Sequence, residues 1–320
     1  MVERQQMSNF ERSCILVVPA YNEANRISQC LDTLVRSDIP EGFLWSEWIV
    51  LDGASDDGTA EIAEKWAAEN KYASFRVISS SVRRGITADF ADFQRYILDD
   101  RYDDFIVVVV EADTEVRSNT LSELLMPFRN NPRLAATFGS CLADDRSWGR
   151  WASTFQLEAT ERLSKLLGSN RSRAMGRIFA YSVGILRGFV WQPGCGGHDA
   201  QLDAFLKLRN LPAMSISSAC VMTMPARGYQ DFFLQTDRIF ASMAATKACF
   251  GQSTDFDYME CSVSMRYRAF LKSALRDPLR ASAYLIARAM CLIWQKTRRR
   301  EFVEAWATSS STKQARSLGR

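Results

Sequence analysis

The sequence predicts an α/β fold: a mostly parallel twisted sheet flanked by helices, followed by a helical C-terminal extension. Two observations support this prediction. From Cys14 to about Gly139, short apolar runs alternate with amphipathic stretches of helical period, which is typical of a sheet with helices on both faces. The run FIVVVVEAD at 105–113 begins with six apolar residues, as expected for a central strand that is covered on both faces.

The elements follow in order. In the first half we expect strands at 14–19, 48–52, 75–79, 105–113 and 134–139, with helices at 24–35, after the DDGT turn at 56–59, at 87–98 and after Ser118 or Asn119. In the second half we expect a helix at 151–167, a strand and turn at 178–186, a Gly-rich loop at 194–197, a helix at 198–208, a strand near 214–222 and then helices. The last dozen residues, 309–320, are polar and basic, so we expect a disordered tail.

Composition excludes several classes of protein. The formal net charge of +3 on 320 residues does not indicate a nucleic-acid partner. The eight cysteines form no C-x-x-C pair and there is a single histidine, so a zinc cluster of the usual spacing is excluded. Scattered cysteines suit a reducing compartment, although pairing in space stays open. With a polar N-terminus and no long apolar run, we expect a cytoplasmic protein.

Acidic residues follow several of the predicted strands. Asp52 ends the second strand, and Glu111 and Asp113 end the strand at 105–113. Carboxylates gathered at one edge of a sheet repel one another unless a cation lies among them. Magnesium or manganese with a substrate diphosphate meets that need, because both metals take hard oxygen ligands.

The usual phosphate-binding loops are missing. No G-x-x-x-x-G-K-[ST] motif occurs, and no G-x-G-x-x-G follows the first strand. The phosphates are therefore expected to depend on a metal and on basic side chains, for which Arg83 and Arg84 lie close behind the third strand.

Three segments together resemble the family 2 glycosyltransferases of the GT-A fold. They are CILVVPAYNEANRISQCLDTL at 14–34, VLDGASDDGTAEIA at 50–63 and VVVVEADTEV at 107–116, and the likeness runs from about 13 to 241. The resemblance implies inverting transfer of a sugar from a nucleotide donor. It also implies a catalytic domain at 13–245, with a donor-binding half to about 140 and an acceptor-side half at 141–245, before a helical extension at 246–308.

The resemblance assigns donor and metal residues. It implies that the segment matching 19–23 lines the nucleobase, that Glu23 and Asp52 hold base and ribose, and that Glu111 and Asp113 form the D-x-D element. Asp113 would ligate Mn2+ or Mg2+, and Glu111, where Asp is usual, would support ribose or metal. The donor-binding candidates are Pro19, Ala20, Tyr21, Glu23, Asp52, Arg84, Glu111, Gln235 and Arg238.

The Gly-rich loop GCGGHD matches the family's E-D element, which implies that Asp199 is the general base. His198 replaces the usual Glu and would tune Asp199 or contact the acceptor. YQDFFLQTDRIFAS resembles the Q-x-x-R-W element, with Ile239 where Trp is usual. The lost Trp and the absence of membrane helices favour a non-processive enzyme that adds one sugar.

Other functions stay open. A sugar-phosphate nucleotidylyltransferase is disfavoured, because PAYNEANR after the first strand lacks its Gly-rich basic loop. A catalytically silent nucleotide-sugar-binding protein is the main alternative, motivated by the altered EAD, HD and QTDRI elements. A UDP-sugar is the favoured donor, with GDP and dTDP open. The acceptor is a lipid-linked molecule, a glycan or a small molecule.

The C-terminal region has two interpretations. Its apolar residues either pack a core or lie with neighbouring arginines and lysines on anionic lipid. We expect core packing together with peripheral contact at the inner face of a membrane. The apolar residues are Phe270, Leu271, Leu275, Leu279, Tyr284, Leu285, Met290 and Trp294, and the basic ones are Arg266, Arg268, Lys272, Arg276, Arg280 and those of 296–300.

Overall fold

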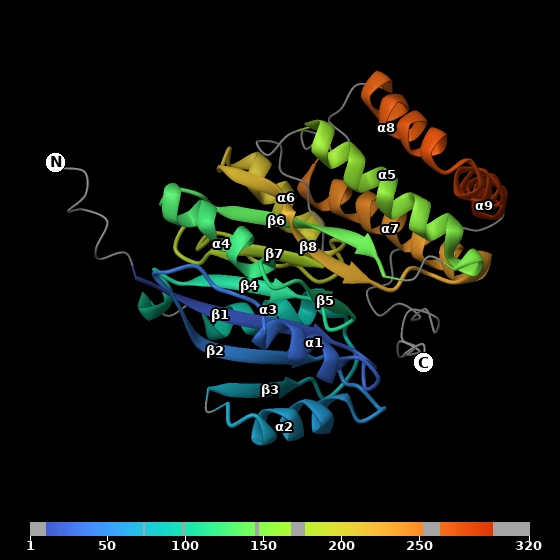
Figure 1. Ribbon diagram of the computed structural model, residues 1–320. Coiled ribbons are helices and arrows are strands. Elements are labelled where there is room, and N and C mark those ends of the chain that lie inside the picture. Colours follow the sequence, from blue (N-terminus) through green and yellow to red (C-terminus); the bar gives the residue numbers. More distant parts are fainter. Residues whose placement is uncertain are drawn as a thin grey trace.

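The computed structural model describes residues 11–72, 74–97, 100–144, 147–167, 177–251 and 263–296, so the predicted tail at 309–320 lies outside it. One eight-stranded sheet in the order β3-β2-β1-β4-β7-β6-β8-β5 runs through the molecule (Figure 1). Its strands are β1 (Arg12–Ala20), β2 (Phe43–Asp52), β3 (Phe75–Ser79), β4 (Ile106–Val110), β5 (Thr114–Val116), β6 (Ala136–Ala143), β7 (Ile178–Ser182) and β8 (Ala213–Thr223). The α-helices are α1 (Ile27–Val35), α2 (Thr59–Glu69), α3 (Ile86–Tyr96), α4 (Thr120–Asn130), α5 (Trp151–Leu167), α6 (His198–Leu208), α7 (Gly228–Phe250), α8 (Val263–Arg276) and α9 (Pro278–Lys296).

The first half of the sheet is parallel, as predicted. β1 lies between β2 and β4 and is parallel to both, and β3 continues the parallel order at the edge. All five residues of β4 are fully buried, which confirms it as a strand covered on both faces. The predicted fold class is therefore confirmed, since helices flank this sheet and a helical C-terminal region follows.

The second half of the sheet is mixed. β7 runs antiparallel between β4 and β6, β8 pairs parallel with β6, and the short β5 pairs antiparallel with β8. The predicted strand at 105–113 is wrong at its end, because β4 stops at Val110. Thr114 donates its backbone N–H to the Glu111 carbonyl, so 111–113 form a turn that leads into β5. That turn lifts both acidic side chains out of the sheet.

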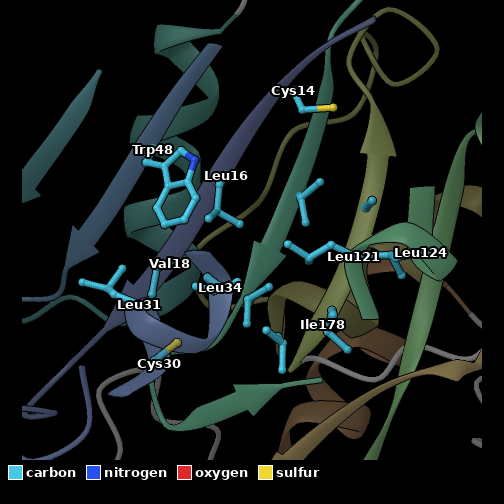
Figure 2. Close-up of a cluster of buried hydrophobic side chains, with 14 of the residues drawn as sticks. Cys14, Leu16, Val18, Cys30, Leu31, Leu34, Trp48, Leu121, Leu124 and Ile178 are labelled. Atoms are coloured by element: carbon cyan, nitrogen blue, oxygen red, sulfur yellow. The ribbon is translucent and has the colours of Figure 1, made fainter. Parts of the chain in front are cut away.

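Side-chain alternation along β1 divides the core between the two faces of the sheet. Leu16 and Val18 pack with α1, α2 and α4 on one face. Figure 2 shows these two side chains beside Leu31 and Leu34 of α1. Ile15 and Val17 point to the other face, where α3 and α6 complete a second cluster.

The C-terminal helices add a further layer. α8 and α9 contact each other and both pack on α5, outside the sheet (Figure 1). Phe155 of α5 is buried, with its ring centroid 5.5 Å from that of Phe270 in α8 and 5.3 Å from that of Tyr284 in α9. Among the described helices, none combines the length and the apolar character that a bilayer crossing demands.

Candidate active site

Backbone hydrogen bonds join three strand ends. The Pro19 carbonyl accepts the N–H of Ala112 at 3.1 Å, and the Ala20 carbonyl accepts that of Gly53 at 2.9 Å. The ends of β1, β2 and the turn after β4 therefore form one continuous edge. This edge brings the predicted residues at 19–23, Asp52, Glu111 and Asp113 into one region, as the carboxyl ends of parallel strands should.

The DDGT segment closes one side of this region. The Glu23 N–H donates to the Thr59 hydroxyl at 2.8 Å, and the Ala24 N–H donates to the Asp57 carboxylate at 3.0 Å. Asp52 is 3% exposed, and its carboxylate oxygens lie 3.3 and 3.4 Å from the Ser55 nitrogen. The loops after β1 and β2 are thus held together around Glu23 and Asp52, the pair predicted to hold a nucleoside.

Arg83 and Arg84 contact Tyr21 and α3 beside these loops. The Arg83 guanidinium stacks 4.0 Å from the centroid of the Tyr21 ring. Arg84 forms an ion pair with Asp92 of α3 and lies 3.7 Å from a carboxylate oxygen of Asp89. Arg84 therefore bonds to α3 in this structure.

Asp89 is a carboxylate that the sequence analysis missed. It is buried in α3, where Ser80 donates a hydrogen bond to it at 2.5 Å, and its other oxygen would lie 3.2 Å from a Cβ placed at Gly53. Burial raises the pKa of Asp89, the Ser80 bond and Arg84 oppose that effect, and Asp92 and Asp52 add to it. The sequence signal was weak, because an acid in a first helical turn is usually only a favourable dipole partner.

Arg177 is the second residue that was missed. Its guanidinium lies 2.5 Å from an Asp113 carboxylate oxygen and 3.3 Å from one of Glu111, so it bridges the predicted D-x-D pair. The Glu111 N–H donates to the Arg177 carbonyl at 3.0 Å, an extension of the β4–β7 pairing that fixes the arginine opposite the acids. A single sequence contains no pattern that predicts the antiparallel pairing of β4 with β7.

The bridge is electrostatically strong. Burial raises the pKa of Glu111, Arg177 opposes that effect and Asp113 adds to it. For Arg177, burial disfavours the charged form, but Asp113 and Glu111 outweigh it and raise the pKa of the guanidinium. Arg177 therefore stays charged and offsets the repulsion between the two carboxylates.

Asp199 lies in the first turn of α6. The N-cap position belongs to Gly197, and Asp199 accepts the Ala200 N–H at 2.8 Å. Arg238 of α7 interacts electrostatically with Glu111, Asp113 and Asp199 together. Arg238 thus lies within electrostatic range of the candidate base and of the D-x-D pair, and the half-buried Gln235 stands three residues before it on the same helix.

Three contacts fix the Gly-rich loop to α7. Cys195 forms a disulfide with Cys249, which resolves the cysteine pairing that the sequence left open. Gly197 donates its N–H to the Ser242 hydroxyl at 2.6 Å, and Thr246 lies against Gly196. The loop that leads to Asp199 is therefore positioned by one face of α7.

His198 belongs to the core. It is buried, and its ring stacks on Phe90 with centroids 5.0 Å apart and lies 5.6 Å from the Phe179 centroid. The ring is held by phenylalanines of α3 and β7, and the predicted role of His198, to tune Asp199 or to contact the acceptor, stays a prediction.

The donor set suits a divalent cation. Glu111 and Asp113 offer hard carboxylate oxygens, with side chains 25% and 16% exposed. Within the described ranges, no three His, Cys, Asp or Glu side chains gather into a complete metal shell. Mg2+ and Mn2+ sites commonly take one or two carboxylates together with substrate phosphates, and this pair fits that pattern.

Solved structures resemble this fold. A mannosyltransferase from Pyrobaculum calidifontis, in complex with GDP-Man and Mn2+, is 20% identical, with 91% of this chain and 89% of that chain covered and a TM-score of 0.58. Glucosyl-3-phosphoglycerate synthase from Mycobacterium tuberculosis, in complex with Mn2+, UDP-glucose and phosphoglyceric acid, is 21% identical, with 75% and 80% covered and a TM-score of 0.52. No match was found among curated protein sequences.

A family model described as glycosyl transferase family 2 matches residues 15–189, which is more than half of the chain. The match spans the loops after β1 and β2 and the whole Glu111–Asp113 turn. The chain therefore belongs to glycosyl transferase family 2.

Proposed function

We propose that this glycosyltransferase moves one sugar from a nucleoside diphosphate sugar to an acceptor hydroxyl, with inversion and without processive addition. The observation that carries the proposal is that Arg238 lies within electrostatic range of Glu111, Asp113 and Asp199. A base and a diphosphate site must lie close together for direct transfer, and the shared influence of these three acids on Arg238 supports that arrangement.

On the donor side, the residues around the β1 and β2 ends surround the nucleoside. The loop at 19–23 and Asp52 contact base and ribose, while Arg84, Gln235 and Arg238 supply polar groups for the diphosphate. The favoured donor is a UDP-sugar. One solved structure of this fold contains UDP-glucose and another contains GDP-Man, so UDP and GDP are the two nucleotides to compare first.

In the transfer step, Asp199 accepts the proton of the acceptor hydroxyl as that oxygen attacks the anomeric carbon. The new carbon–oxygen bond forms on the face opposite the diphosphate. The bond between the anomeric carbon and the β-phosphate oxygen breaks, and its electrons leave with the nucleoside diphosphate. Arg238 stabilises the charge that develops there. A bound Mn2+ or Mg2+, held through Asp113 and Glu111, would supply further charge neutralisation to the leaving diphosphate.

The test measures nucleotide binding and turnover separately. Calorimetric titration with UDP, GDP and dTDP, each with and without Mn2+, identifies the donor class, and Asp113→Ala is expected to weaken the metal-dependent binding at least about tenfold. Asp199→Asn is expected to keep nucleotide affinity but lower turnover by a factor of about 10² to 10⁴, because it removes the base. Asp203→Asn, the same charge change one turn later in α6, is the control and should retain turnover.

The outcomes separate the alternatives. Folded protein that binds no nucleotide contradicts the proposal. Tight nucleotide binding with no transfer to any acceptor class, in wild type and Asp199→Asn alike, would instead identify a silent binding protein, which the altered EAD, HD and QTDRI elements motivate.

A further inference from the structure

Large exposed apolar side chains gather on the two C-terminal helices. Val263, Tyr267, Leu271 and Leu275 of α8 recur every four residues and are 78%, 64%, 41% and 76% exposed. From the start of α9 onward, Leu279, Leu285, Ile286, Met290, Leu292 and Ile293 are exposed as well. Soluble surfaces rarely expose so many neighbouring apolar groups unless something binds them.

The outward orientation of these side chains follows from how the helices pack. The opposite faces of α8 and α9 are filled by small residues against the rest of the protein: Ala269, Ser273, Ala281, Ala287 and Cys291 are all buried. Both helices pack on α5 and on each other. The exposed side chains point away from α5, and the surface that they form is called here the α8–α9 face. The two helices lie at the outer end of the molecule (Figure 1).

The charge of α8 and α9 indicates the chemistry of the partner that would bind their exposed face. Residues 263–296 contain seven lysines and arginines but one acid, Asp277, which is 3.2 Å from Arg280. On α8, the exposed Arg268, Lys272 and Arg276 each follow an exposed apolar residue by one position, so a basic row flanks the apolar row. Apolar side chains flanked by basic ones are what an interfacial helix presents to anionic lipid.

We propose that the α8–α9 face docks on an anionic lipid bilayer. A second copy of the chain fits less well, because the exposed Arg268, Lys272 and Arg276 of two such faces would repel one another. The chain's own residues 297–320 do not supply the missing negative charge either, since they contain six basic and two acidic residues.

The face is connected to the site. On the inner side of α9, the Trp294 ring centroid lies 6.0 Å from that of Phe233, and the Arg288 guanidinium lies 4.6 Å from the centroid of Phe240, both on α7. α7 also carries Gln235 and Arg238. A bilayer bound at the α8–α9 face is therefore one helix layer away from the proposed diphosphate residues, which favours an acceptor at the lipid surface.

The test uses the full chain and vesicle flotation. Binding is compared on phosphatidylcholine vesicles and on vesicles with about 30% phosphatidylglycerol, at about 0.1 M and about 0.5 M salt. Wild type is expected to float with the anionic vesicles at low salt only. Leu275→Glu, Leu279→Glu and Ile293→Glu combined should abolish flotation, and changing Arg268, Lys272 and Arg276 to Gln should weaken binding about fivefold per charge removed.

A control variant carries two changes of the same kind elsewhere on the surface. Leu44→Glu and Val190→Glu replace apolar residues that are 56% and 54% exposed on other parts of the surface, and this variant should float like wild type. Wild type that fails to float with anionic vesicles, or a triple Glu variant that still floats, overturns the proposal. So does a wild-type dimer by light scattering that the triple Glu variant converts to a monomer, because the face would then join two copies.

The vesicle result is independent of the proposed function. Nucleotide binding measured by calorimetry should be unchanged in the triple Glu variant, since all three side chains are exposed and outside the proposed site. Loss of flotation with intact nucleotide binding supports the lipid face alone, and absent nucleotide binding in wild type counts against the transferase proposal alone.

Discussion

At the scale of single residues, Arg177 determines the electrostatics of the candidate site. One guanidinium compensates the charges of Glu111 and Asp113, whose carboxylates would otherwise repel each other. A divalent cation that binds Asp113 must therefore compete with Arg177 for the same oxygens. Arg177 then becomes available for the donor's phosphates.

Arg177→Gln is accordingly expected to raise the affinity of the nucleotide-free protein for Mn2+ by about tenfold, because the acid pair loses its own cation. With Mn2+ saturating, the variant should bind nucleotide more weakly. Electron paramagnetic resonance of free Mn2+ measures the first effect and calorimetry the second.

The control for this change is Arg187→Gln. Arg187 also bridges two carboxylates, with Asp100 at 2.7 Å and Asp103 as its other partner, but it does so on the surface. The Arg187→Gln variant should therefore bind Mn2+ with the same affinity as wild type. If Arg177→Gln binds Mn2+ no better than wild type while its circular dichroism is unchanged, Arg177 does not compete with the cation.

The limits of sequence prediction are also clearest at this scale. The acids at the strand ends could be predicted, since strands and their ends follow from apolar runs and turn residues. Arg177 and Asp89 could not, because their positions depend on β7 entering the sheet antiparallel to β4 and on α3 closing over Gly53. Long-range pairing of this kind leaves no local pattern.

At the scale of elements, the contact between the Gly-rich loop and α7 determines the position of Asp199. Gly196 has a φ of +96°, and a Cβ there would lie 2.0 Å from the Thr246 hydroxyl and 2.5 Å from the Ser242 carbonyl. The sequence predicted the loop and the helix after it. It did not predict that Ser242, Thr246 and Cys249 of one α7 face would anchor them.

Gly196→Ala is therefore expected to destabilise the protein by about 3 kcal/mol or more, from backbone strain plus the overlap with α7, and to lower turnover by displacing Asp199. Urea unfolding measures the change in the free energy of unfolding. Gly194→Ala is the matched control: it has a φ of +84° but nothing within 4 Å of the added Cβ, so only the strain of about 1 to 2 kcal/mol should remain. Equal losses of stability in Gly196→Ala and Gly194→Ala would show that the contact with α7 contributes nothing to the stability of the protein.

At the scale of the whole molecule, the chain contains two kinds of packing. The sheet and its flanking helices bury two large apolar clusters. The contact of α5 with α8 and α9 depends on a much smaller cluster of Leu163, Met265 and Ala269 and on a few aromatic rings. Regions with fewer buried apolar contacts open at lower free energy. The C-terminal helices should therefore open before the sheet does.

Phe155→Ala tests this order. The ring is 1% exposed between α8 and α9, so its removal should cost about 3 to 5 kcal/mol of local stability. Amide hydrogen exchange should accelerate in 263–296 while β1 and β4 keep their protection, and vesicle flotation should weaken because the α8–α9 face loses its support. Phe138→Ala, in the sheet core, is the comparison and should accelerate exchange in the strands too. Uniform acceleration across sheet and C-terminal helices in Phe155→Ala would mean that the molecule opens as one cooperative unit, and that the lipid-binding helices cannot move without disturbing the transferase site.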